Sequence, residues 1–190
     1  MISANFTTSR LFQTIKNGGY LVKGLMIALP ISIVLTCVLW AILELIEKKS
    51  CDDSKVKQII VQRKKWILGL GFYILLLIQM GVISRTPGSI REVVWIPFQT
   101  PGGDNLIVLY SLANMVIFIP LGILVPNVFH GVNSVWAMAL VTFITSVCIE
   151  LIQYALACGY SEVEDVIMNV AGGVIGYLII RRIEKRKTTE

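Results

Sequence analysis

Five hydrophobic stretches occupy most of this 190-residue chain, and three of them carry amide or carboxyl side chains in their outer halves. Inside a membrane no water is available to such groups, so each unpartnered amide or carboxylate costs several kcal/mol. The ones that matter most in the last three stretches are Asn114, Glu150, Gln153, Asp165 and Asn169. A fold that keeps these stretches in a membrane must therefore give these five side chains partners.

The composition is that of a membrane protein. Hydrophobic residues make up 55% of the chain and charged residues 15%, whereas soluble domains carry roughly a quarter charged residues. We therefore expect an all-α fold, a polytopic membrane helix bundle of about five transmembrane helices, as one integral membrane domain over residues 1–190. The four cysteines show no CxxC spacing and His130 is the only histidine, so no metal site and no cofactor are expected.

Hydropathy places the five helices with short connections between most of them. The expected ranges are about 22–44, 66–84, 106–125, 132–155 and 163–180. Residues 85–105 are rich in proline and glycine, so this segment is expected to be a loop at the outer membrane face.

The basic residues predict the orientation. Most of the 17 Lys and Arg lie between the first two helices or in the C-terminal tail. The positive-inside rule then places the N-terminus outside and the C-terminus inside. Because the +5 net charge gathers beside the helices, it reports on topology, and no nucleic-acid partner is expected.

This topology brings the polar residues to one depth. At 1.5 Å per residue, Asn114 lies about 12 Å below the outer end of its helix. Glu150 and Gln153 lie near the outer end of the fourth helix, and Asp165 and Asn169 near that of the fifth. All five are therefore expected in the outer half of the bilayer.

Helical spacing also gathers them on single faces. Ser146, Glu150 and Gln153 are spaced i, i+4 and i+7, and Asp165 and Asn169 are spaced i and i+4. The face of the fifth helix continues into Gly172 and Gly176, a GxxxG pair that favours close helix packing. We therefore expect this helix to pack through the face that carries its polar residues.

The two carboxyl groups are the strongest functional candidates, because an ionisable residue inside a membrane span is a functional site by default. Arg85, at the outer end of the second helix, is the expected partner of Glu150, with Arg91 as the second choice. Without a cation nearby, desolvation would keep Glu150 neutral. For Asn114, Gln153 and Asn169 a purely structural role as hydrogen-bonding links between helices remains open.

Ser161 and Glu164 form a capping-box pattern before the fifth helix. Glu162 and Glu164 are therefore interpreted as acids that suit a helix N-terminus.

Three blocks of sequence resemble the VanZ-like family of small bacterial membrane proteins. They are Asn114-MVIFIPLG-Ile123, Glu150-LIQ-Tyr154 and Glu162-VEDVIMNVAGGVIGY, preceded by Arg85 and Ile96-Pro97-Phe98. The resemblance covers about residues 80–180. The family includes a member linked to low-level teicoplanin resistance in enterococci, so the resemblance implies a multi-pass protein of the bacterial cytoplasmic membrane connected with antibiotic resistance.

The leading hypothesis is a non-enzymatic cell-envelope protein with an outward-facing polar site. Membrane lipids would surround it, and its ligand would be an amphiphilic envelope component, such as a lipid-linked cell-wall component or a lipoglycopeptide. Glu150 and Asp165 would bind a cationic or hydroxylated group, and Arg85 a carboxylate or phosphate. Asn114, Gln153 and Asn169 would position that ligand.

The alternatives are an intramembrane enzyme acting on a lipid-linked substrate, or a small proton-coupled transporter with Glu150 as its relay. No catalytic residue is assigned, and a homo-oligomer stays open.

Overall fold

Five long helices make up most of the computed structural model, which describes residues 2–49, 55–83, 85, 87–88, 90–95 and 105–189. They are α1 (Ile2–Lys49), α2 (Lys55–Ile78), α3 (Asn105–Val128), α4 (Val135–Ala155) and α5 (Val163–Thr189). A short π-helix, η1 (Gln79–Ile83), continues α2. Each long helix contains a stretch long and apolar enough to cross a membrane, which confirms the predicted bundle of five spans.

The first two helices are longer than hydropathy predicts. α1 begins at Ile2 rather than near 22, and α2 begins at Lys55 rather than near 66. Hydropathy marks only the apolar part of a helix, whereas Lys, Arg and Gln are good helix formers and extend it beyond that part. Lys64, expected just before the second helix, lies inside α2 and pairs with Glu44 and Glu47 of α1 at 2.5 and 3.0 Å.

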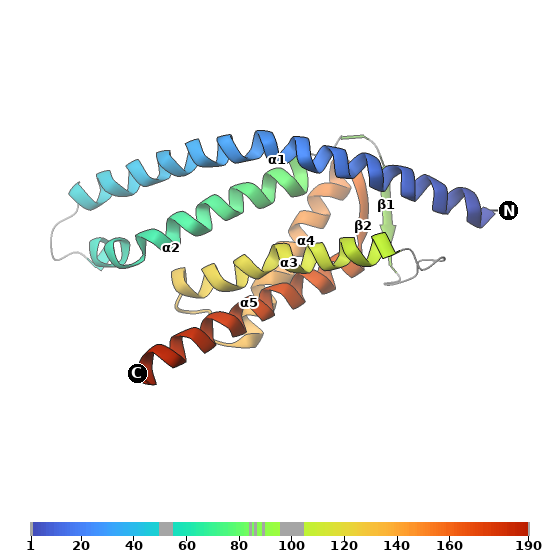
Figure 1. Cartoon of the computed structure of the whole chain (residues 1–190). Helices are drawn as coiled ribbons and strands as arrows, with labels where there is room; N and C mark the ends of the chain where they lie inside the picture. The colour runs from blue at the N-terminus through green and yellow to red at the C-terminus, as the bar shows by residue number, and fades with distance from the viewer. Residues whose placement is uncertain are drawn as a thin grey trace.

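Two short strands, which the sequence did not predict, lie at one end of the bundle. β1 (Ile90–Val94) and β2 (Cys158–Glu162) pair in parallel, with Ile90 opposite Cys158 and Val94 opposite Glu162. Figure 1 shows this pair at the end of the bundle where α4 ends and α5 begins, while the C-terminus lies at the opposite end. The segment after α2 is therefore not a continuous helix, as expected, and it is held to the start of α5 by a strand pair.

α3 and α5 approach each other closely through glycine. A Cβ atom added at Gly122, Gly172 or Gly176 would lie 2.0 or 2.1 Å from a backbone oxygen of the facing helix. At Gly173 it would lie 2.2 Å from Thr142 Oγ1 of α4. The predicted close packing of the fifth helix through its small residues is confirmed.

The apolar core lies between α2, α3, α4 and α5. Its buried members are Leu70, Leu77, Phe118, Leu121, Val125, Met138 and Tyr177. Many other apolar side chains face outwards; Trp136, for example, is 85% exposed and Met26 73%. A belt of exposed apolar side chains around a helix bundle is what a lipid environment requires.

Candidate functional site in the membrane-spanning bundle

The predicted site residues lie at the end of the bundle that carries the strand pair. Arg85 follows η1, Asn114 lies in the first half of α3, Glu150 and Gln153 lie near the end of α4, and Asp165 and Asn169 lie near the start of α5. Figure 1 shows these ends of α3, α4 and α5 near β1 and β2. We call these six residues the polar cluster.

Hydrogen bonds and charge link four members of the polar cluster. Asn114 on α3 hydrogen-bonds the Asp165 carboxyl group on α5. Glu150 accepts a hydrogen bond from the backbone N–H of Glu162. The two carboxyl groups interact electrostatically with each other, and both interact with Arg85. Arg85 thus interacts with both acids through charge alone, because no ion pair joins it to either carboxyl group among the described residues.

The other two members bind neighbouring helices through their amide nitrogens. Gln153 Nε2 donates to the backbone oxygen of Gly81 in η1 at 2.7 Å. Asn169 Nδ2 donates to Ser146 Oγ on α4 at 2.8 Å. Both amides thus connect helices, as the structural interpretation of these residues predicts.

The same residues leave acceptor atoms without a donor. Among the described residues, the buried side-chain oxygens that lack a hydrogen-bond partner are Glu150 Oε2, Gln153 Oε1 and Asn169 Oδ1. Glu150 and Gln153 are spaced i and i+3 on α4, and Asn169 contacts α4 one turn earlier, at Ser146. The acceptors are therefore spread over about two turns of one face of α4.

Two contacts in this region were not predicted from the sequence. Ser111 Oγ on α3 donates to Glu164 Oε1 on α5, and both residues are buried. Ser161 Oγ donates to the backbone oxygen of Glu150 at 3.1 Å. The capping-box interpretation is therefore wrong, because α5 begins at Val163 and these side chains reach other elements.

One signal in the sequence indicates the first of these contacts. Ser111 precedes Asn114 by three residues, so both lie on the face of α3 that meets α5. The side chains of Arg91 and of Ile96, Pro97 and Phe98 lie outside the described residues. Within the described part of the chain, no group of three or more His, Cys, Asp or Glu is placed to hold a metal ion.

Five apolar helices with lipid-type surfaces and a polar cluster between them define a multi-pass helical membrane protein. The chain belongs to the VanZ/LLP1 family, whose sequence model matches residues 32–184. The resemblance seen in residues 80–180 is thus confirmed, and the match extends back into α1.

A relative from Enterococcus faecium, "Protein VanZ", is 28% identical over 111 residues. The aligned region spans 58% of this chain and 66% of that relative, which is just under two thirds of the relative's length. No solved structure matches this chain.

Proposed function

We propose that this chain is a non-enzymatic protein of the bacterial cytoplasmic membrane whose polar cluster opens to the outer side. It binds an amphiphilic component of the cell envelope, either a lipid-linked cell-wall component or a lipoglycopeptide. The observation that carries this proposal is the set of buried oxygens on Glu150, Gln153 and Asn169 without a donor among the described residues.

The chemistry of these atoms specifies the ligand group. An acceptor left unpaired in a buried site costs about 1–3 kcal/mol, so a ligand that brings N–H or O–H donors recovers this energy. An ammonium or hydroxyl group on an amphiphile supplies such donors. The amide nitrogens of Gln153 and Asn169 hold the acceptors in place through Gly81 and Ser146.

The charged residues of the polar cluster suit a ligand whose head group carries both a positive and a negative charge. In this proposal Glu150 and Asp165 bind the cationic group of the ligand, while Arg85 binds its carboxylate or phosphate. Amphiphilic envelope components carry such head groups on hydrocarbon tails, and the exposed apolar belt of the bundle suits those tails.

Membership of the VanZ/LLP1 family supports the part of this proposal that concerns glycopeptide tolerance. The similarity to Protein VanZ of Enterococcus faecium supports the same connection. In this proposal the chain lowers sensitivity to teicoplanin-type antibiotics by binding or shielding the amphiphile on which the drug depends.

Susceptibility testing in a teicoplanin-sensitive host examines this function. The wild-type chain is expected to raise the inhibitory concentration, and Glu150→Gln and Asp165→Asn, at matched membrane levels, are expected to return it to the empty-vector value. Glu47→Gln is the matched control, since it makes the same change near the far end of α1, where Glu47 pairs with Lys64. Full resistance in both cluster variants, or none with the wild type, contradicts the proposal.

The second candidate function is an intramembrane enzyme acting on a lipid-linked substrate. The observation in its favour is the electrostatic coupling of Glu150 and Asp165, since paired carboxyl groups can divide the roles of acid and base. Lipid profiling of a strain that lacks the gene distinguishes the two functions. An enzyme predicts accumulation of an unmodified lipid-linked substrate, whereas a binding protein leaves the lipid profile unchanged.

A further inference from the structure

A pocket lies at the other end of the bundle, away from the polar cluster. It has a volume of about 440 Å³, within the range of about 300–1,000 Å³ typical of small-ligand sites. Its lining comes from α2, from the end of α3 with the loop that follows it, and from α5. These lining residues are Gln62, Arg63, Trp66, Pro126, Asn127, His130, Arg181 and Glu184.

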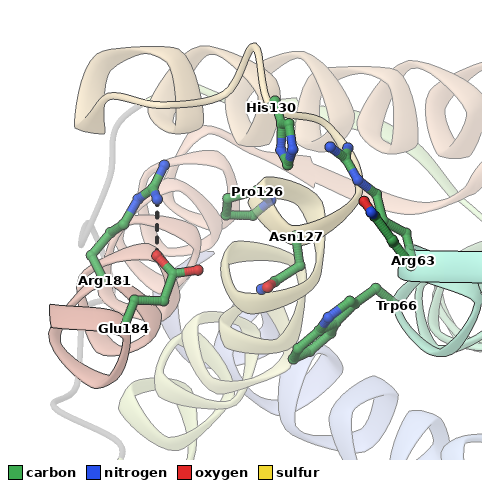
Figure 2. A pocket seen from close by; sticks show the side chains of 8 residues that line it. Arg63, Trp66, Pro126, Asn127, His130, Arg181 and Glu184 are labelled. Atoms are coloured by element: carbon green, nitrogen blue, oxygen red, sulfur yellow. Dashed lines mark hydrogen bonds and ion pairs between the residues drawn. The ribbon is translucent and has the colours of Figure 1, made fainter. Parts of the chain in front are cut away.

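Figure 2 shows how charge is arranged around this space. Arg181 and Glu184 lie on one side and Arg63 on the opposite side, while His130 and Asn127 lie between them. The lining thus contains two guanidinium groups and one carboxylate, and the imidazole of His130 adds a further nitrogen donor. The lining therefore carries more positive than negative charge.

Both guanidinium groups are held in place by hydrogen bonds. Arg63 Nη1 donates to the backbone oxygen of Val128 at 2.5 Å. Arg181 Nη1 donates to Glu184 Oε2 at 2.9 Å, and its guanidinium lies 5.2 Å from the centre of the Tyr177 ring. A guanidinium has five N–H donors, so each arginine retains donors beyond the bonds that position it.

We infer that this pocket binds a phosphate group through Arg63 and Arg181. The planar fork of arginine matches phosphate oxygens, and the lining of this pocket contains two such forks. The pocket lies where membrane spans end, beside Trp66, a residue type that is common at membrane interfaces. Basic pockets between transmembrane helices on the cytoplasmic side bind the head groups of anionic lipids. Free phosphate offers the same chemistry, so the experiment separates the two sources.

The test uses the full chain in micelles of a detergent without phosphate, dodecyl maltoside, with phosphatidylglycerol and inorganic phosphate as separate probes in native mass spectrometry. Binding of phosphatidylglycerol without inorganic phosphate identifies a lipid head group as the source. Binding of inorganic phosphate, with displacement of the lipid, identifies soluble phosphate. If neither probe binds, the inference is wrong.

Matched arginine variants localise the site. Arg63→Gln and Arg181→Gln are each expected to weaken binding of the active probe about tenfold, which corresponds to about 1.4 kcal/mol. Arg182→Gln removes the same charge from the neighbouring exposed position of α5 and is expected to leave binding within twofold of the wild type. Equal losses in all three variants indicate diffuse surface charge and overturn the assignment to this pocket.

Loss of binding in the arginine variants could also come from misfolding, so a variant that is expected to strengthen binding is the complementary test. Glu184→Gln deletes the carboxylate that occupies Arg181, so the pocket becomes more positive. Binding of the active probe is expected to tighten severalfold, because the variant lacks a carboxylate that repels the phosphate group. Unchanged or weaker binding in Glu184→Gln contradicts the inference even if the arginine variants lose binding.

Discussion

Asn169 on α5 donates a hydrogen bond of 2.8 Å to Ser146 on α4, whose side chain is fully buried. The bond lies one helical turn from Glu150 and joins the two helices that carry both carboxyl groups of the polar cluster. It uses the amide nitrogen of Asn169 and leaves Oδ1 without a donor among the described residues. The same side chain therefore fixes the helix contact and offers an acceptor.

This bond predicts a measurable coupling between the two residues. Asn169→Leu and Ser146→Ala should each lower the free energy of unfolding, and the double variant should lose less than the sum. Interhelical hydrogen bonds in membranes are worth about 0.6 kcal/mol on average and up to about 1.7 kcal/mol. A double-mutant cycle on reversible unfolding in bicelles measures this coupling.

Thr145 supplies the control for that cycle. Its hydroxyl donates to Val141 within the same helix at 2.8 Å, so Thr145→Ala should show no coupling to Asn169→Leu. A coupling below about 0.3 kcal/mol between Asn169 and Ser146 is within the additivity of independent sites and contradicts the prediction.

Helical periodicity predicted much of this arrangement. The order and the ends of the helices predict that Glu150 and Asp165 lie at the same end of the bundle, and the 3.6-residue repeat predicts which neighbours share their face. Both the position and the helical face of a residue depend only on its own segment of sequence, so the meeting of the polar faces of α3, α4 and α5 was predictable. The close packing of Gly172 and Gly176 followed from the same local pattern.

Contacts between distant segments could not be predicted in this way. The pairing of β1 with β2 joins residues that are far apart in the chain, and a parallel pair needs a connection that leaves no local signature. The partner of Gln153 is the backbone oxygen of Gly81, which lies in a π-helix without a marked sequence signal. Glu164 has the local pattern of a capping residue, but its contact with Ser111 depends on where α3 lies.

Glycine at the contact of α3 and α5 should be required for stability. A Cβ atom at Gly172 would lie 2.0 Å from Met115 O, so Gly172→Ala must push the helices apart. Overpacking of this kind costs about 1–3 kcal/mol, which thermal unfolding in detergent measures. Gly131→Ala, where no atom lies within 4 Å of the added carbon, is the control. A change of less than about 0.5 kcal/mol at Gly172, the scale of a surface substitution, means that α3 and α5 are not in such close contact.

Ser111 should stabilise the bundle through Glu164. Ser111→Ala removes a donor from a buried carboxylate, and the expected loss is about 1–3 kcal/mol of unfolding free energy. The same change in a Glu164→Gln background should cost less, because the acceptor is then no longer charged. Equal costs in both backgrounds, measured by chemical unfolding, contradict a contribution from the charge of Glu164.

Arg85 should stabilise the folded chain by compensating the two acids of the polar cluster. Arg85→Gln is expected to lower stability by at least about 1 kcal/mol, since surface substitutions usually stay within about 0.5 kcal/mol. Adding Asp165→Asn to Arg85→Gln should recover part of that loss, because the double variant lacks one of the two acids that Arg85 faces as well as the cation itself. Arg182→Gln controls for loss of charge alone. A double variant less stable than Arg85→Gln contradicts this electrostatic role.

The orientation of the bundle determines whether the polar cluster and the pocket at the opposite end face the outside or the cytoplasm. The excess of Lys and Arg near the α1–α2 connection and the C-terminus predicts that this end faces the cytoplasm. A cysteine at the exposed position His130 should then be protected from a membrane-impermeant maleimide in intact cells, while one at the exposed position Pro87 reacts. The variants should first lose the four native cysteines, and permeabilised cells should label both positions. The reverse pattern would turn the polar cluster towards the cytoplasm, and a ligand in the outer leaflet would then have no access to Glu150.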